Sequence, residues 1–360
     1  MDEVFTMARS FSAIRASRAG GGPGSDSARI IAQLRGEPAR RRAWLRALPA
    51  LLALAAAARD ASAAPAGDLA LEPVAPGVYV QRGRDDPPFT ANRGVLIGPS
   101  GVLVINPGRS HADGAALLAA IGRLTARPVV LAIDTQATPD AVLGNSAFAA
   151  RGVPILAHRA TAAFMARNCT ACIAGFAQQS GATPDATPAV APNWLIDGST
   201  TLQPGGRTVE LLHLGWTEQP GTLAVYDRAS GVLFTGNLAR IDHLPDVHAA
   251  HLPAWRDALR RLRALGPRRV VPGHGPVAGP ARLDEVASYL AQLEQATAAA
   301  YASGMSLQDA VATVAAPAFR GWTGYAGGQE RNVHFVYLDL ERAELDALAP
   351  PARRAAEAPP

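Results

Sequence analysis

Residues 131–145 read "LAIDTQATPDAVLGN": an apolar run that ends at Asp134, a polar loop, and a helix that begins near Asp140. The apolar run predicts a buried strand. A strand–loop–helix junction often carries functional side chains, because the rigid strand fixes what the loop presents. This loop offers threonine, glutamine and one aspartate, without histidine. A lone histidine, His274, stands between glycines in "VVPGHGPV" (270–277), at the end of another predicted strand.

Strands and helices alternate on both sides of this stretch, which predicts an α/β fold. Residues 179–206 are rich in Pro, Gly and Thr and predict a long surface connection, whereas residues 281–347 are expected to be helical apart from a loop around 321–328. The other expected strands are 77–82, 94–97, 101–105, 129–133, 154–157, 207–213, 221–226, 232–235 and 269–271, and the expected helices are 113–124, 140–150, 159–167 and 253–264.

The charge distribution argues against a nucleic-acid-binding protein. Ten of the 34 basic residues, all arginine, and five of the 30 acidic residues lie in residues 1–63. The rest of the chain therefore has 24 arginines against 25 acids, a net charge of −1. No basic excess remains to bind a phosphate backbone.

Residues 1–63 resemble an extension with an export signal. Arginines 40–42 and 46 precede an apolar stretch, 47–58, and the small residues 61–63 form a cleavage site. The apolar stretch is shorter than the roughly 20 residues that a membrane span needs. The arginine pair also resembles a twin-arginine signal, so Sec and twin-arginine export both stay open. We expect a periplasmic or secreted protein without a stable span after signal removal, and a disordered tail at 351–360.

The two cysteines, Cys169 and Cys172, have C-x-x-C spacing, and a helical stretch over 161–178 would place both on one face. In an exported protein such a pair could form a local disulfide, remain as buried thiols, or act as a redox couple. The flanking sequence lacks the βαβ context of a thioredoxin-like site, which favours the first two interpretations. The chain also lacks a G-x-S-x-G elbow and a Walker loop after a strand.

Several strand-end segments together resemble the metallo-β-lactamase superfamily. They are "GVLVINPG" (101–108), "TQATPDAVLGN" (135–145), "LLHLGWTEQPGTLAVY" (211–226), "GVLFTGNL" (231–238) and "VVPGHGPV" (270–277). The chain is most similar to the exported quinoprotein relay system zinc metallohydrolases. The resemblance implies a domain at 64–350 with an αββα sandwich: two mixed sheets, outer helices, a helical C-terminal section, and a site at one edge.

The superfamily's metal ligands are largely replaced at the matching positions. Two of the ligand residues are kept, Asp140 and His274. The histidines of the first loop fall on Gln136, Thr138 and Ala141, the histidine of the third loop on Glu218, and the two aspartates on Asn237 and Asn106. We expect these residues, with His243, to line the former metal site.

Two alternative metal sites stay open. Asp140, Glu218 and His274 would give one histidine and two carboxylates, which suit Mn²⁺ or Ca²⁺ as well as zinc. The loop 242–251 carries His243, His248 and His251, although these histidines could instead form a polar loop that caps the helix at Pro253. Asp140 could likewise cap its own helix, and His274 could hydrogen-bond Asp140.

Three functions follow. The favoured interpretation is an exported, non-catalytic protein without a cofactor, which binds a small molecule or a periplasmic protein near quinoprotein dehydrogenases. The alternative is a metal-dependent hydrolase of an ester, thioester or lactone. The third is a redox accessory protein that acts through Cys169 and Cys172.

Overall fold

The computed structural model describes residues 69–84, 90–168 and 189–348. All of them belong to one compact unit, Ala66–Pro360. The predicted export signal, Cys169 and Cys172, and the predicted tail at 351–360 lie outside the described residues.

The first sheet has seven strands in chain order. Neighbouring strands are antiparallel from β1 to β4 and parallel from β4 to β7. The strands are β1 (Glu72–Ala75), β2 (Val78–Gln81), β3 (Arg93–Ile97), β4 (Val102–Ile105), β5 (Val129–Ile133), β6 (Ile155–His158) and β7 (Trp194–Ile196).

The second sheet has five strands in the order β12-β11-β10-β9-β8. All pairs are antiparallel except β11 and β12, which are parallel. The strands are β8 (Thr200–Leu202), β9 (Val209–His213), β10 (Leu223–Asp227), β11 (Val232–Arg240) and β12 (Arg269–His274). Each sheet thus mixes parallel and antiparallel pairs.

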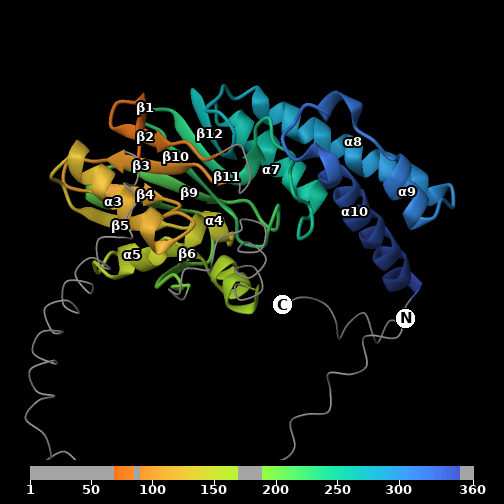
Figure 1. Cartoon of the computed structure of the whole chain (residues 1–360), viewed down its shortest axis with the longest axis horizontal. Coiled ribbons are helices and arrows are strands. Elements are labelled where there is room, and N and C mark those ends of the chain that lie inside the picture. Colours follow the sequence, from red (N-terminus) through yellow and green to blue (C-terminus); the bar gives the residue numbers. More distant parts are fainter. Residues whose placement is uncertain (1–68, 85–89, 169–188, 349–360) are drawn as a thin grey trace, which may run out of the picture. The chain divides into compact units, whose positions relative to one another are not determined.

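The two sheets pack face to face with helices outside (Figure 1). Leu103 and Ile133 of the first sheet share a buried cluster with Val225 and Phe234 of the second. The helices α3 (His111–Leu124) and α5 (Asn145–Ala149) cover the outer face of the first sheet. The second sheet is covered by α7 (Leu252–Ala264) and α8 (Arg282–Ala302). The predicted αββα sandwich is confirmed.

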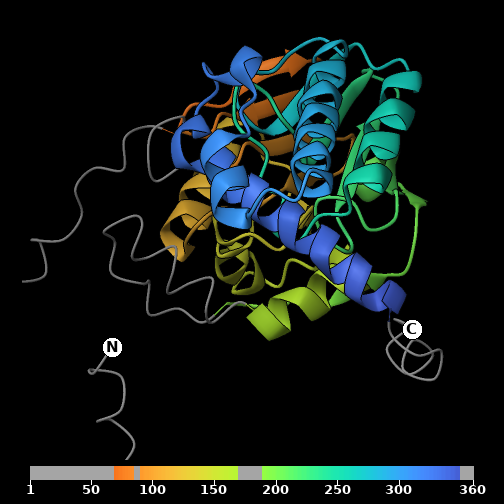
Figure 2. The same cartoon turned by 90° about the vertical axis from the view of Figure 1, so that its right-hand side faces the viewer.

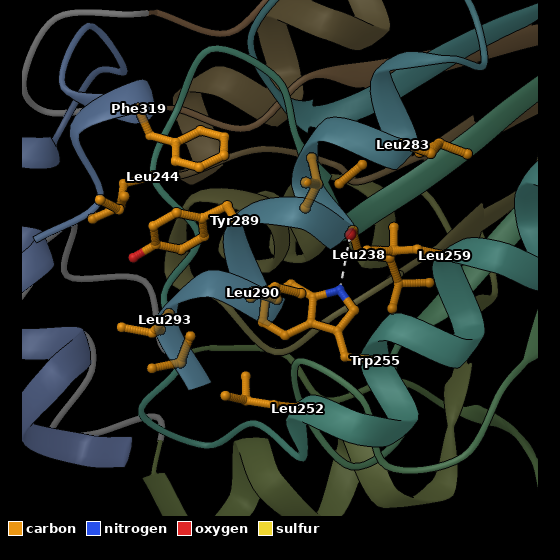
Figure 3. Close-up of a cluster of buried hydrophobic side chains, with 14 of the residues drawn as sticks. Leu238, Leu244, Leu252, Trp255, Leu259, Leu283, Tyr289, Leu290, Leu293 and Phe319 are labelled. Carbon is orange, nitrogen blue, oxygen red and sulfur yellow. Dashed lines mark hydrogen bonds between the residues drawn. The ribbon is translucent and has the colours of Figure 1, made fainter. Parts of the chain in front are cut away.

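The predicted helical C-terminal section is also confirmed. It consists of α8, α9 (Leu307–Thr313) and α10 (Tyr325–Leu348), and α10 lies against α8 and α9 (Figure 2). Trp255 of α7 is fully buried in one apolar cluster with residues of α8. Its indole Nε1 donates a 2.9 Å hydrogen bond to the carbonyl of Leu238 on β11 (Figure 3). This bond joins α7 to β11.

Two local predictions were wrong. Residues 179–206 are not simply a surface connection, because β7 and β8 lie within them. Strands of three residues are too short to show a periodic pattern. The helix expected at 140–150 is two short helices, α4 (Pro139–Val142) and α5. The helix is interrupted at Gly144, because a Cβ added there would lie 2.5 Å from the carbonyl oxygen of Pro107.

Among the described residues, no helix combines the length and apolar character that crossing a membrane requires.

Replacing Asn332 with alanine is expected to lower the free energy of unfolding by about 2 kcal/mol, since a buried acceptor left without its donor keeps its full desolvation cost. Asn332 is fully buried on α10, and its Nδ2 lies 2.7 Å from the carbonyl of Pro245 and 2.8 Å from the hydroxyl of Tyr289. Urea unfolding measures the change. The exposed Asp346→Ala on the same helix is the control and should stay near zero; equal effects of the two variants would contradict this role of Asn332.

Candidate functional site

The candidate site lies where strand ends of the two sheets meet. Asn106 follows β4 with a left-handed backbone (φ 57°), which asparagine tolerates better than most residues. Its Oδ1 accepts hydrogen bonds from the backbone N (3.1 Å) and the hydroxyl (2.9 Å) of Thr135, just after β5. The predicted site residue Asn106 therefore holds the loop 134–138 in place.

The two retained residues contact each other directly. His274 ends β12, and its Nε2 lies 3.2 Å from Oδ2 of Asp140, the second residue of α4. Both side chains are buried. The expected hydrogen bond between them is confirmed. Asp140 does not cap α4, which the sequence had left open: Thr138 holds the cap position, and Asp140 lies inside the first turn, where it bonds to His274.

Burial lowers the pKa of His274 to about 4, with a further contribution from the charge of Arg240. Burial alone would raise the pKa of Asp140, but the hydrogen bond to His274 and further contributions, including Thr138 and Arg240, hold it below its usual value. At neutral pH, therefore, a neutral His274 donates Nε2–H to the Asp140 carboxylate. Its Nδ1, also buried, then carries a free lone pair and has no hydrogen-bond partner among the described residues.

The residues in place of the other ligands bond to one another. The Gln136 side chain contacts the Thr135 hydroxyl and accepts from the backbone N of Asn237 at 3.4 Å, and its Nε2 lies 3.5 Å from the hydroxyl of Thr138. Ala141 is fully buried and offers only a methyl group. Asn237 Oδ1 is buried and, like His274 Nδ1, lacks a partner within the described ranges.

Glu218 lies buried in the loop between β9 and β10 and accepts a 3.1 Å hydrogen bond from the hydroxyl of Thr222. Burial, with the nearby charge of Asp246, raises the pKa of Glu218 to about 7. Across 69–84, 90–168 and 189–348, no three His, Cys, Asp or Glu side chains form a group able to hold a metal ion. The structure thus brings Asp140 and His274 together without Glu218 as a third ligand.

The three histidines of the loop 242–251 make different contacts and do not form one cluster. The ring of His243 lies 5.9 Å from that of His274, centroid to centroid, so His243 does adjoin the site as predicted. His248 pairs with Asp246 at 3.0 Å. His251 is the N-cap of α7 and accepts from the backbone N of Ala254, so the capping interpretation of this loop is confirmed for His251.

Arg240 is the site residue that the sequence did not reveal. It ends β11 and pairs in register with His274, although its neighbour in the ladder, Gly236, pairs with Pro272. Two extra residues are therefore inserted in β11, a bulge of the kind that redirects side chains near functional sites. The guanidinium interacts electrostatically with Asp246, Asp140 and Glu218. No motif of the superfamily marks an arginine here, and alternation along a regular strand would separate Asn237 from Arg240.

The buried carboxyl group of Asp134 was also missed. It lies between β5 and the site loop, and Asn145 Nδ2 donates a 2.7 Å hydrogen bond to its Oδ2. Burial raises the pKa of Asp134 to about 8, and the bond from Asn145 offsets only part of this. Asp134 is therefore mostly protonated at neutral pH, which lets it pack beside the apolar strand ends.

The comparisons with known proteins fit this geometry. The sequence profile of the Metallo-beta-lactamase superfamily matches residues 87–274, slightly more than half of the chain. The chain belongs to this superfamily. The metallo-β-lactamase from Pontibacter korlensis superposes with a TM-score of 0.53 at 22% identity, over 62% of this chain and 98% of that one. The DIM-1 metallo-β-lactamase exposed to ceftazidime gives a TM-score of 0.52 at 18% identity, over 62% and 96%.

Membership of the metallo-β-lactamase superfamily implies a metal, but this member's residues do not fit one. Catalytic zinc takes about three His, Asp, Glu or Cys ligands and keeps an open position for water. Here an amide, a hydroxyl and a methyl group stand at three of the positions that match the superfamily's ligands by sequence. The fixed positive charge of Arg240 also acts electrostatically on Asp140. We derive no chemical step through a metal.

Proposed function

We propose that this chain is a non-catalytic member of the superfamily that binds a small molecule at the former metal site. The observation that carries the proposal is the replacement of the ligands: Gln136, Thr138 and Ala141 stand where the superfamily motif has histidines, which leaves Asp140 and His274 to contact each other at 3.2 Å. A histidine and an aspartate alone do not make up the three-ligand set with which a catalytic zinc activates water. Binding, in contrast, needs only groups that a ligand can satisfy.

Two buried acceptors support a ligand that donates hydrogen bonds. His274 Nδ1 and Asn237 Oδ1 have no partner among the described residues, and buried acceptors are nearly always satisfied by a protein group, water or ligand. Asn237 Oδ1 lies against the residue that precedes His274, since a Cβ added at Gly273 would be 2.5 Å from it. Buried acceptors suit a small molecule better than a partner protein, which remains the alternative occupant.

The cellular setting rests on the sequence. The leader at 1–63 supports export to the periplasm or beyond, by either route. The similarity to quinoprotein relay system zinc metallohydrolases supports an accessory role near periplasmic quinoprotein dehydrogenases. The competing function is a metal-dependent hydrolase, and the metal content of the chain distinguishes it from the non-catalytic function.

The test is the metal content of the full-length chain, purified without chelator or a metal-binding tag, beside His274→Ala. We expect far less than one metal ion per chain in both proteins, and no turnover of an ester, thioester or lactone panel. Circular dichroism checks that both are folded. One metal per wild-type chain, lost in His274→Ala, would overturn the non-catalytic function and favour the hydrolase.

A further inference from the structure

We propose that Arg240 is the internal cation of this site: its guanidinium neutralises the carboxylates of Asp140 and Glu218, which a metal ion would otherwise do. This inference rests on the proposed function, because it assigns to a side chain the charge that a metal-free site has to find elsewhere.

The backbone brings Arg240 to the right place. Its register partner across the β11–β12 ladder is His274, whose Nε2 contacts Asp140. One guanidinium nitrogen, Nη1, lies 3.3 Å from the carbonyl oxygen of Leu244, which anchors the side chain. Its Nε is buried without a hydrogen-bond partner in the described part of the chain. The ladder thus places Arg240 next to His274, and through His274 near Asp140.

The carboxylates need this charge because their nearest partners are neutral. Asp140 receives hydrogen bonds from an imidazole and a hydroxyl, His274 and Thr138. Glu218 receives one from the Thr222 hydroxyl. An ionised carboxylate out of water is costly unless it is paired. Arg240 interacts electrostatically with both carboxylates.

The other nearby charges are engaged elsewhere. Arg93 also acts on Asp140, but its Nη2 lies 2.8 Å from Asp113 Oδ2. Asp246, the third carboxylate near Arg240, has partners of its own: His248 Nδ1 at 3.0 Å and Arg331 Nη2 at 3.4 Å. Arg240, in contrast, acts on both buried carboxylates.

A double-mutant cycle on the full-length chain tests the pairing. We expect Arg240→Met to lower the melting temperature by at least about 5 °C, because it leaves buried carboxylates unpaired. Arg240→Lys, which keeps the charge, should lose less. Asp140→Asn should destabilise the wild type but restore part of the melting temperature in the Arg240→Met background. If Arg240→Met does not fold alone, recovery of a folded double variant is the expected rescue.

Arg331→Met is the matched control, since Arg331 is an arginine that contacts Asp246 and not Asp140. Its effect should add to that of Asp140→Asn without coupling. Equal effects of Asp140→Asn in the wild-type and Arg240→Met backgrounds, or a double variant that stays unfolded, would overturn the role of Arg240. Those results would leave the non-catalytic function standing, which only stoichiometric metal in the wild type overturns.

Discussion

Replacing Arg207 with alanine is expected to lower the free energy of unfolding by about 3–5 kcal/mol, the usual cost of leaving one member of a buried ion pair alone. Arg207 precedes β9, and its Nε lies 3.2 Å from Oδ2 of Asp227, which is fully buried. Its other nitrogens donate to the carbonyls of Ile97 (3.1 Å) and Pro76 (3.3 Å). One side chain thus joins the end of β10 to the first sheet. Urea unfolding at pH 7 measures the loss.

The matched control lies one residue beyond Asp227. Arg228 forms an ion pair with Glu210, Nε to Oε1 at 2.7 Å, but its side chain is 59% exposed. Solvent screens such a pair, so Arg228→Ala should change stability by less than about 1 kcal/mol. Similar losses in Arg207→Ala and Arg228→Ala would show that the link between the sheets does not depend on the buried pair.

Asp134→Asn is expected to remove most of the loss of stability that the wild type suffers as pH rises. The folded pKa of Asp134, about 8, lies above its unfolded value of 3.8. The folded chain therefore holds a proton that the unfolded chain releases, so this group's contribution is full below about pH 4 and is lost as pH rises to about 8. Between pH 5 and 8 the wild type should lose about 3 kcal/mol relative to Asp134→Asn.

Urea unfolding of both proteins at several pH values between 5 and 8 measures this difference. Asp346→Asn removes an exposed carboxylate on α10 and should run parallel to the wild type. Glu218, with a pKa near 7 for the same reason of burial, contributes a slope of the same sign to all three proteins and cancels in the comparison. Parallel curves for the wild type and Asp134→Asn would mean that Asp134 is ionised in the folded chain.

Much of the fold could be predicted from the sequence, because the strand-end segments keep their order and most strands have clear apolar runs. The misses have local causes. The three-residue strands β7 and β8 gain their hydrogen bonds from neighbours distant in sequence, Leu156 for Trp194 and Leu211 for Thr200. The break between α4 and α5 reflects the approach of Gly144 to Gly108, whose backbone groups bond at 2.7 Å. The periodicity of a single segment carries no information on these long-range contacts, so neither the short strands nor the helix break could be predicted from it.

The site was predictable where it depends on motif positions. Asp140 and His274 each lie in a segment that resembles a superfamily motif. Their contact follows once both segments lie at the same edge of the sandwich. Arg240 is different, since its place depends on the bulge between Gly236 and Arg240, a feature of the β11–β12 register. Asp134 looks like the polar end of an ordinary strand, and only its full burial reveals the raised pKa.

Calorimetric titration of Zn²⁺ into the chelator-treated full-length chain tests the central claim most directly: Asp140 and His274 bind each other and not a metal ion. We expect no saturable one-to-one binding in the wild type, and the same weak heats in Asp140→Asn and His274→Ala. A saturable isotherm with one site per wild-type chain, abolished in both variants, would contradict the claim.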